Sequence, residues 1–209
     1  MTNKYQPKKK FFTIPSAPQT PPLIGEAKNS LLSFLKIVLY YYRLKLRRIF
    51  NMIKLDIKGY GSMMIELDPV AAPKTVANFE ALVEKGFFDG LTFHRIIKGF
   101  MIQGGDPAGN GTGGCKPEIY GEFASNGWTQ NTISHKKGVI SMARTSDPNS
   151  ASCQFFIVHE DSEFLDGNYA AFGHVTEGLE VLDAVASVAT YPNDMPCKKV
   201  VIKKMSIVK

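Results

Sequence analysis

One short stretch of the chain, residues 92–114, combines polar and bulky apolar side chains that could do chemistry together. The candidates in it are His94, Arg95, Phe100, Met101 and Gln103. Arginine is a permanent cation with several N–H donors. A hydrogen bond from such a cation is strengthened where apolar neighbours exclude water. We therefore interpret the stretch as an apolar pocket with one fixed cation at its edge.

Two short strands are expected to carry these side chains. Phe93 to Ile97 alternates between apolar and polar residues, which is the period of a half-buried strand. After a break at Lys98-Gly99, residues 100–103 predict a second strand. The glycine-rich residues 104–114 have no Gly-Lys-Ser/Thr ending and no helix pattern after them, so they do not match a nucleotide-phosphate loop. We interpret them as a tight loop that shapes a pocket wall.

The rest of the chain must supply a scaffold for this pocket. Alternating or short buried apolar runs predict about eight strands, at 52–58, 62–67, 93–97, 100–103, 138–143, 154–158, 171–175 and 199–208. Only two helices are expected, one from Pro73 to just before Gly86 and one at 178–188. Many short strands with few helices favour a closed eight-stranded antiparallel β-barrel, mainly β and capped by two helices, over an alternating α/β sheet.

The charge is divided unevenly along the chain. Residues 1–51 hold ten Lys/Arg and one acid, whereas residues 52–209 hold 15 Lys/Arg and 18 Asp/Glu. A domain that binds nucleic acid normally carries the positive charge itself. Nucleic acid is therefore not an expected partner of the domain.

The cysteines and histidines show no pattern of a metal site. Cys115, Cys153 and Cys197 are odd in number, and none of them is spaced like a ligand with the four histidines. We expect free thiols in a reducing compartment, with Cys153 as a small core residue. No Ser/His/Asp arrangement for nucleophilic catalysis is evident, and neither a metal nor a cofactor is expected.

The first 51 residues form a separate basic extension. Prolines between residues 15 and 22 oppose regular structure. The apolar run Leu31 to Tyr42 is shorter than the about 20 residues that span a membrane. One interpretation is a basic amphipathic helix on a membrane surface. The other, which we favour, is that translation starts at Met52, because Arg47-Arg48 and the residues after them could encode a bacterial ribosome-binding site. A native protein that begins before Met52 would contradict it.

Several motifs of residues 52–209 together resemble one known family. The motifs are Phe93-His94-Arg95, 99–106 (GFMIQGGD), 110–114 (NGTGG), 141–143 (SMA), 154–157 (QFFI) and 165–167 (LDG). In this order they resemble the cyclophilins, which are peptidyl-prolyl cis–trans isomerases. The resemblance covers nearly all of 52–209 and none of the extension, so we expect residues 52–209 to be a cyclophilin-type isomerase domain of a bacterial-like, single-domain kind.

The resemblance implies a role for each matching position. Arg95 matches the catalytic arginine, with Gln103 and Phe100 beside it. The walls of the proline pocket match Phe100, Met101, Phe156 and Leu165. Positions that line the peptide or hydrogen-bond its backbone match Gln103, Gly111, Ala143 and Gln154. His94, next to the arginine, is expected to help position the site.

Three positions depart from the best-known eukaryotic pattern and resemble bacterial members. Phe164 replaces a tryptophan, Tyr169 a histidine and Arg144 an asparagine. They are kept as substrate-binding candidates, with the asparagine's contact expected through the backbone of Arg144. Because phenylalanine lacks the indole N–H donor, cyclosporin-type ligands are expected to bind weakly.

The implied function is acceleration of X–Pro isomerisation in unfolded or flexible polypeptides during protein folding. Rotation about a peptide bond has a barrier of about 18–20 kcal/mol. Arg95 could donate to the proline nitrogen as its lone pair localises, and Gln103 could hold the neighbouring carbonyl. The alternative is a proline-peptide binding module or chaperone with incidental isomerase activity. A monomer in the cytoplasm is expected, with membrane contact only if the extension is real.

Overall fold

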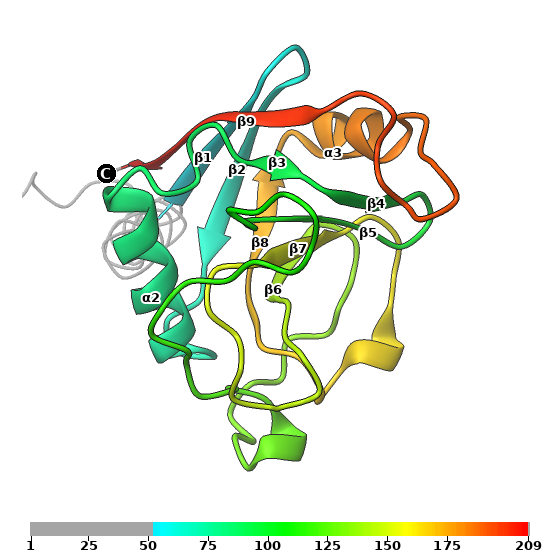
Figure 1. Cartoon of the computed structure of the whole chain (residues 1–209). Coiled ribbons are helices and arrows are strands. Elements are labelled where there is room, and N and C mark those ends of the chain that lie inside the picture. Colours follow the sequence, from blue (N-terminus) through cyan, green and yellow to red (C-terminus); the bar gives the residue numbers. More distant parts are fainter. Residues whose placement is uncertain (1–51, 209) are drawn as a thin grey trace, which may run out of the picture. The chain divides into compact units, whose positions relative to one another are not determined.

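The structure is a computed structural model that describes residues 52–208. These residues form one antiparallel sheet of nine strands in the order β3-β9-β1-β2-β8-β6-β7-β5-β4, which curves into a nearly closed barrel (Figure 1). The strands are β1 (Met52–Ile57), β2 (Gly61–Leu67), β3 (Thr92–Phe93), β4 (Arg95–Ile97), β5 (Met101–Gly104), β6 (Val139–Met142), β7 (Phe155–Val158), β8 (Ala171–Glu177) and β9 (Val200–Val208). The expected barrel is confirmed.

Within the described residues, two α-helices pack on the barrel, as expected. Helix α2 (Pro73–Glu84) begins at a proline, whose missing N–H costs nothing in the first turn. Helix α3 (Leu179–Ala186) buries one face made of Val181, Leu182, Val185 and Ala186. Two 3-10 helices, η1 (Ala124–Asn126) and η2 (Glu163–Leu165), were not expected from the sequence.

Residues 52–208 have nine strands instead of the expected eight or so because one expected strand is divided. The alternating run at 93–97 is broken at His94 into β3 and β4. Strand β3 pairs with β9, whereas β4 pairs with β5. These are the two edges of the sheet, so the chain itself joins them through His94.

Strands β5, β6 and β7 separate two apolar clusters. Their inward side chains join the main core, which is centred on the buried rings Phe79, Phe88, Phe155 and Phe172. Their outward side chains join a second cluster, whose buried members are Met101, Val139, Phe156, Val158, Leu165 and Ala171. Because side chains alternate along a strand, Phe155 and Phe156 belong to different clusters. The second cluster is the apolar part of the site described below.

A buried carboxylate ties the long connection after β5 to the start of α2. Glu122 is 0% exposed and accepts hydrogen bonds from Lys74 N at 3.0 Å and Thr75 N at 2.8 Å. These are two of the N–H groups that a helix leaves without intrahelical partners. The contact holds Glu122 against the first turn of α2.

Two glycines with the same backbone angle offer a test of how tightly the glycine-rich loop is packed. Gly90 and Gly105 both have φ of +83°, but a Cβ at Gly105 would lie 2.3 Å from Cys153 O, whereas nothing lies within 4 Å at Gly90. We expect Gly90→Ala to lower the free energy of unfolding by about 1–2 kcal/mol, the cost of the left-handed conformation. Gly105→Ala should cost at least twice as much in urea denaturation. Equal losses would show that the loop yields easily.

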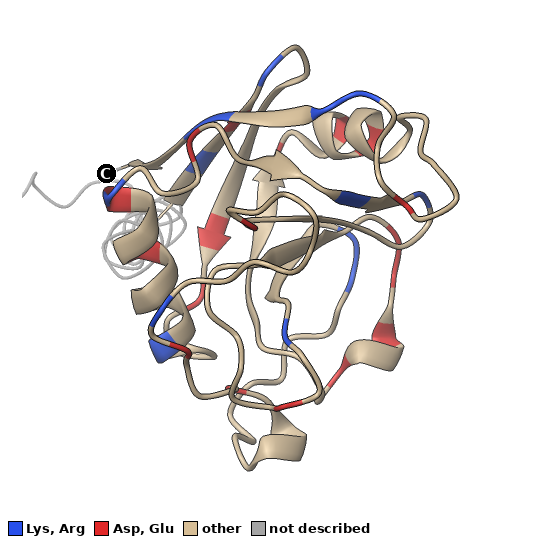
Figure 2. Ribbon diagram, viewed as in Figure 1, with Lys and Arg blue, Asp and Glu red and all other residues tan. Residues whose placement is uncertain are grey.

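Lys and Arg of the described residues are spread among Asp and Glu over the ribbon (Figure 2). No helix in the described part is long and apolar enough to cross a membrane. The expectations for residues 1–51, including the apolar run at 31–42 and the start at Met52, lie outside the described residues.

Candidate active site

Strand register places four site side chains in one row across the outer face of the sheet. Arg95 in β4 pairs with Gln103 in β5, Gln103 with Phe156 in β7, and Phe156 with Ser141 in β6. Paired residues point to the same face of a sheet. A cation, an amide, an aromatic ring and a hydroxyl thus follow one another. We call these four residues the site row.

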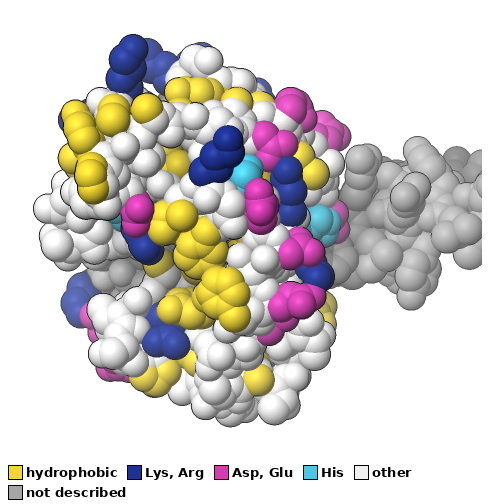
Figure 3. All heavy atoms as spheres, turned by 90° about the vertical axis from the view of Figure 1, so that its right-hand side faces the viewer, with side chains coloured by type: hydrophobic (Ala, Val, Ile, Leu, Met, Phe, Trp, Pro, Cys, Tyr) yellow, Lys and Arg dark blue, Asp and Glu magenta, His cyan; other side chains and the backbone are white. Residues whose placement is uncertain are grey.

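Beside the site row lies the second apolar cluster. Met101, Phe156 and Leu165 are buried in it, and Phe100, Ala143 and Tyr169 pack against it with part of their surface exposed. The ring of Phe164 is 71% exposed and contacts the Phe100 ring at 5.5 Å between centroids. Figure 3 turns the right-hand side of Figure 1 toward the viewer and shows a central patch of hydrophobic side chains with Lys or Arg close to it, as well as a separate hydrophobic group at the upper left.

A line of amide hydrogen bonds links the site row to the glycine-rich loop. Gln103 Nε2 donates to Gln154 Oε1 at 2.8 Å, and Gln154 Nε2 donates to Gly113 O at 2.6 Å and Gly111 O at 3.1 Å. This use of Nε2 leaves Gln103 Oε1 to accept from a ligand. Gln103, Gly111, Ala143, Arg144 and Gln154 line a groove of about 690 Å³. The groove can take an extended peptide past Gln103.

The guanidinium of Arg95 is held from one side only. Its Nε donates to Asp194 Oδ2 at 3.3 Å, and Asp194 O accepts from Ile96 N at 2.9 Å. Asp194 is the single non-glycine residue with positive φ, 65°, among residues 52–208. Within the same residues no acceptor contacts the two terminal nitrogens of Arg95. They are therefore available to a ligand, while Asp194 fixes the direction of the side chain.

His94 lies behind the site and makes no hydrogen bond through its ring. It is 7% exposed, and neither Nδ1 nor Nε2 has a partner among the described residues. The ring packs beside Gly111, where a Cβ would lie 3.7 Å from Nε2. Burial lowers the pKa of His94; the carboxylate of Asp106 opposes this, and the cation of Arg95 adds to it. His94 is thus a neutral support for the loop.

Asp106 organises the loop from the inside. Its buried carboxylate accepts hydrogen bonds from the backbone N–H groups of Ala108, Asn110 and Gly111. Burial alone would raise the pKa of Asp106, but these backbone donors, with that of Gly113, hold it below its usual value. The loop therefore keeps its shape through a charged group that the sequence analysis left without a role.

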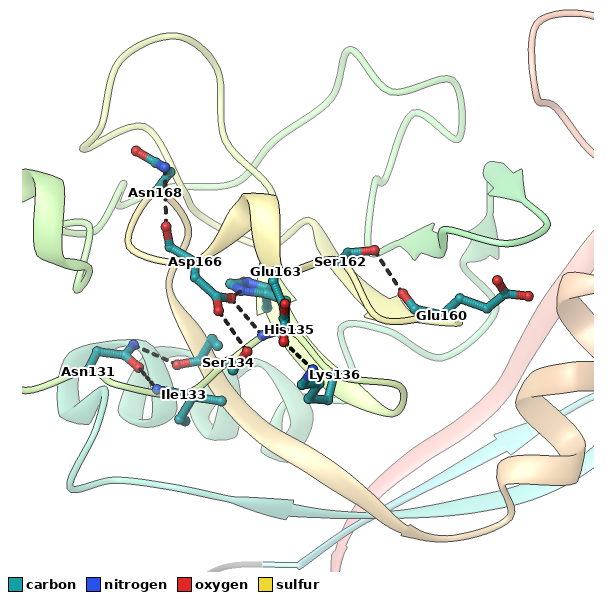
Figure 4. Close-up of polar contacts among 12 residues, drawn as sticks. Asn131, Ile133, Ser134, His135, Lys136, Glu160, Ser162, Glu163, Asp166 and Asn168 are labelled. Atoms are coloured by element: carbon teal, nitrogen blue, oxygen red, sulfur yellow. Dashed lines mark hydrogen bonds and ion pairs between the residues drawn. The ribbon is translucent and has the colours of Figure 1, made fainter.

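A second hydrogen-bond network is centred on His135 and Asp166 (Figure 4). His135 is 0% exposed; its Nδ1 lies 2.8 Å from Asp166 Oδ1 and its Nε2 3.0 Å from Ser141 Oγ. Its ring stacks on Phe156, with centroids 6.0 Å apart and an interplanar angle of 16°. Asp166 also accepts from His135 N and from Ser134 Oγ, each at 2.7 Å. The network connects the site row to the turn after η2.

Arg144 is occupied by its own surroundings. Its guanidinium lies over the rings of Tyr169 at 4.7 Å and Phe123 at 5.2 Å. Its Nε and Nη2 donate to Asn168 O at 3.1 and 3.0 Å, and its Nη1 donates to Thr145 O at 2.8 Å. The side chain therefore braces Tyr169 at the groove's edge and leaves only its backbone for a ligand.

All thirteen residues named from the sequence lie on or behind this face of the barrel. The structure brings Arg95, Gln103 and Phe156 into one row and places Phe164 at its most exposed margin. Sequence reasoning missed Asp106, His135, Ser141, Asp166 and Asp194. Asp106, Ser141 and Asp166 lie inside the quoted motifs, which is a signal for their importance. Asp194 lies 99 residues from Arg95, and no local pattern indicates that contact.

Two of the three buried histidines, His94 and His135, predict a pH dependence of stability. Burial lowers the folded-state pKa of both His94 and His135, the latter against the opposing effect of Asp166. Below about pH 6.5 the unfolded chain binds protons that the folded chain does not. The free energy of unfolding should therefore fall as pH decreases from about 7 to 5. Below about pH 4 the lowered pKa values of Asp106 and Asp166 should remove further stability.

Urea denaturation of His94→Leu across the same pH range tests this. The variant should show a shallower slope between pH 7 and 5, because one imidazole that the fold keeps neutral is gone. His174→Gln removes an exposed imidazole from β8 and serves as the control, with the slope of the parent chain. An unchanged slope in His94→Leu would contradict the assignment.

The arrangement can bind a neutral chain and polarise one polar group, because it has donors, an apolar wall and a cation. The described residues contain no group of His, Cys, Asp and Glu that could hold a metal ion. The free Cys153 is buried, as expected for a core residue.

Residues 52–207 match the model of the family described as cyclophilin type peptidyl-prolyl cis-trans isomerase/CLD. The chain is 52% identical over 115 residues to peptidyl-prolyl cis-trans isomerase B of Bacillus subtilis, covering 55% of this chain and 76% of that protein. It is 40% identical over 147 residues to peptidyl-prolyl cis-trans isomerase CYP18-1 of Arabidopsis thaliana, covering 70% and 90%.

Solved structures agree with these sequence matches. A cyclophilin type peptidyl-prolyl cis-trans isomerase from Cryptosporidium parvum superimposes with a TM-score of 0.70 at 31% identity, covering 77% of this chain and 98% of that one. A second crystal structure, of the same protein in the presence of the dipeptide Ala-Pro, gives a TM-score of 0.69 at 31% identity, covering 76% and 99%.

Proposed function

The chain belongs to the cyclophilin-type peptidyl-prolyl cis–trans isomerases and isomerises X–Pro bonds, and we propose that Arg95, Gln103 and the second apolar cluster carry out the reaction. The substrates we propose are proline-containing segments of unfolded or flexible polypeptides, acted on during folding. The crystal structure of the Cryptosporidium parvum relative in the presence of the dipeptide Ala-Pro supports proline-containing peptides as substrates.

The reaction breaks no bond and needs only the loss of amide conjugation. As the X–Pro bond twists, the proline nitrogen regains a localised lone pair and becomes a hydrogen-bond acceptor. Arg95 keeps its proton, so it acts as a fixed donor rather than an acid. With Nε held by Asp194, a terminal nitrogen can donate to that lone pair. The contact exists only in the twisted state, which is the condition for catalysis rather than tighter binding.

Gln103 and the apolar cluster hold the two sides of the twisting bond. The proline ring packs on Phe100, Met101, Phe156 and Leu165, where water is excluded and the Arg95 hydrogen bond gains strength. Gln103 and Gln154 bind the backbone beside the proline, because their amides are already oriented by their mutual hydrogen bond. The observation that carries this proposal is the site row, which aligns the donor, the amide and the wall.

The second candidate is a proline-peptide binding module or chaperone that uses the same pocket. One observation favours catalysis over this candidate. Asp194 adopts a positive φ, which is strained for a non-glycine residue, and its carboxylate orients Arg95. A module that only bound proline would not require an oriented cation at the pocket edge.

The experiment is the cis-to-trans rate of a short X–Pro peptide with the full chain, together with the affinity for the same peptide. Rate acceleration proportional to enzyme concentration supports the proposal. Peptide binding without acceleration would favour the binding module. A parallel folding assay, with a protein whose refolding is limited by proline isomerisation, asks whether folding chains are substrates.

Cyclosporin-type ligands should bind weakly. Phe164 has no N–H donor, although its exposed ring is in place next to Phe100. We expect Phe164→Trp to raise the affinity about ten-fold, the value of one good hydrogen bond. Calorimetry on the parent chain and the variant measures this, and an unchanged affinity would show that residue 164 is not the determinant.

We also propose that the protein acts as a cytoplasmic monomer.

A further inference from the structure

Two thiols approach each other behind the glycine-rich loop. Cys115 follows Gly113 and Gly114 and is half-buried, whereas Cys153 directly precedes Gln154 and is 0% exposed. Both thiols are free, and Cys115 lies near enough to Cys153 to affect the pKa of the Cys153 thiol. Their neighbours in the chain are the residues whose mutual hydrogen bonds hold the groove.

Backbone contacts keep the two segments side by side. Ile119 N donates to Ala151 O at 2.8 Å in an isolated antiparallel bridge. Cys115 N donates to Ser152 Oγ at 3.2 Å, and the same hydroxyl lies 3.8 Å from Cys153 Sγ. The approach of the thiols therefore follows from the fold of these segments.

The two thiols differ in their access to solvent. Cys115 lines the groove together with Gln103 and Gln154, so a dissolved oxidant reaches it first. Burial, and next the neighbouring Cys115 thiol, raise the pKa of Cys153 to about 12. Cys153 thus keeps its proton at neutral pH and is not itself the first site of attack.

We propose that Cys115 and Cys153 form a peroxide-reactive pair that closes to a reversible disulfide and thereby lowers isomerase activity. In the first step the Cys115 sulfur attacks one oxygen of hydrogen peroxide and the O–O bond breaks. The departing hydroxide takes the thiol proton and leaves as water, and Cys115 becomes a sulfenic acid. In the second, the Cys153 sulfur attacks the Cys115 sulfur, the S–O bond breaks, and the hydroxyl leaves as water with the Cys153 proton. Two electrons pass from the thiols to the peroxide, and a thiol reductant returns them.

The loss of activity follows from what the disulfide must move, and this part rests on the proposed function. A disulfide brings the sulfurs to about 2.05 Å, much closer than two thiols that are not bonded to each other can lie. Cys153 is 0% exposed and lies two residues before β7, whereas Cys115 is only half-buried, so the displacement falls on Cys115 and the glycines before it. Gly113 O is the 2.6 Å acceptor for Gln154 Nε2. Its displacement disturbs the amides that hold the peptide.

The test treats the reduced full chain with hydrogen peroxide and follows intact mass and isomerase rate. We expect a loss of two hydrogens, a Cys115–Cys153 cross-link in the peptide map, and a fall in kcat/KM of about ten-fold, as a displacement near 1 Å can produce. Dithiothreitol should restore both mass and rate. In Cys153→Ser, dimedone should label Cys115, because the sulfenic acid then has no second thiol to attack it.

Each variant is compared with its own reduced rate. Cys115→Ser should keep that rate after peroxide, whereas Cys197→Ser should respond like the parent chain, since the exposed Cys197 has no part in the pair. An unchanged mass, a cross-link to Cys197, or a Cys115–Cys153 disulfide without loss of rate would overturn the proposal. A reduced chain without isomerase activity would instead refute the proposed function, because the mass readout does not depend on it.

Discussion

Arg95→Ala is expected to lower kcat/KM for an X–Pro peptide by about 10²–10³-fold, the usual effect of removing one preorganised donor at a developing charge. The side chain of Arg95 is 44% exposed and its ion pair with Asp194 is open to solvent. Such a pair contributes at most about 1 kcal/mol to folding. The loss should therefore appear in the isomerase assay, with the unfolding transition nearly unchanged.

Two matched variants separate the possible causes of that loss. Arg95→Lys keeps the charge but not the planar set of donors, and should recover only part of the activity. Arg144→Ala removes the other arginine of this face, whose guanidinium contacts Asn168 O and the Tyr169 ring. It should reduce stability more than Arg95→Ala does and activity far less. An Arg95→Ala chain with more than a tenth of the parent activity would show that the cation is not the main donor.

His135→Ala is expected to lower the free energy of unfolding by about 3–5 kcal/mol, the combined cost of a cavity and of buried polar groups left without partners. The imidazole touches Asp166, Ser141 and the Phe156 ring while being 0% exposed. Without it, the Phe156 wall of the pocket loses its support. Urea denaturation and kcat/KM at a temperature where the variant stays folded should both decrease, the latter about ten-fold.

His135→Asn is the control for this prediction. Its amide N–H can replace Nδ1 as the donor to Asp166 but cannot reach Ser141 or stack on Phe156. Stability should be partly restored, whereas activity should remain low if the stacked ring supports the wall. Full recovery of both by asparagine would mean that only the Asp166 contact matters.

The barrel could be predicted because the sequence of each strand shows a local strand pattern, either alternating or continuously apolar. Alternation in β1 and β2, and the short apolar runs at β6 and β7, give strand positions without any knowledge of distant contacts. The break at His94 could not be predicted, since the alternation continues through it. It arises because one side of the segment must pair with β9 and the other with β5, which is a demand of closing the sheet.

The site, too, could be predicted only in part from the sequence. Arg95, Phe100, Met101 and Gln103 lie close together in the chain, so the sequence alone could group them. The resemblance to a known family supplied the more distant wall residues Phe156 and Leu165. The supporting contacts, Arg95 with Asp194 and His135 with Asp166, join segments 99 and 31 residues apart. Register and loop packing set these contacts, and one sequence carries no local sign of either.

The central claim is that Arg95 acts on the twisted state and not on the bound peptide. NMR exchange spectroscopy on an X–Pro peptide with the full chain measures the cis–trans exchange rate on the enzyme and the peptide's affinity in one sample. We expect Arg95→Ala to bind the peptide within about three-fold of the parent affinity while its exchange rate on the enzyme falls at least about 100-fold. Loss of affinity with an unchanged exchange rate in the bound fraction would contradict the account and make Arg95 a binding residue.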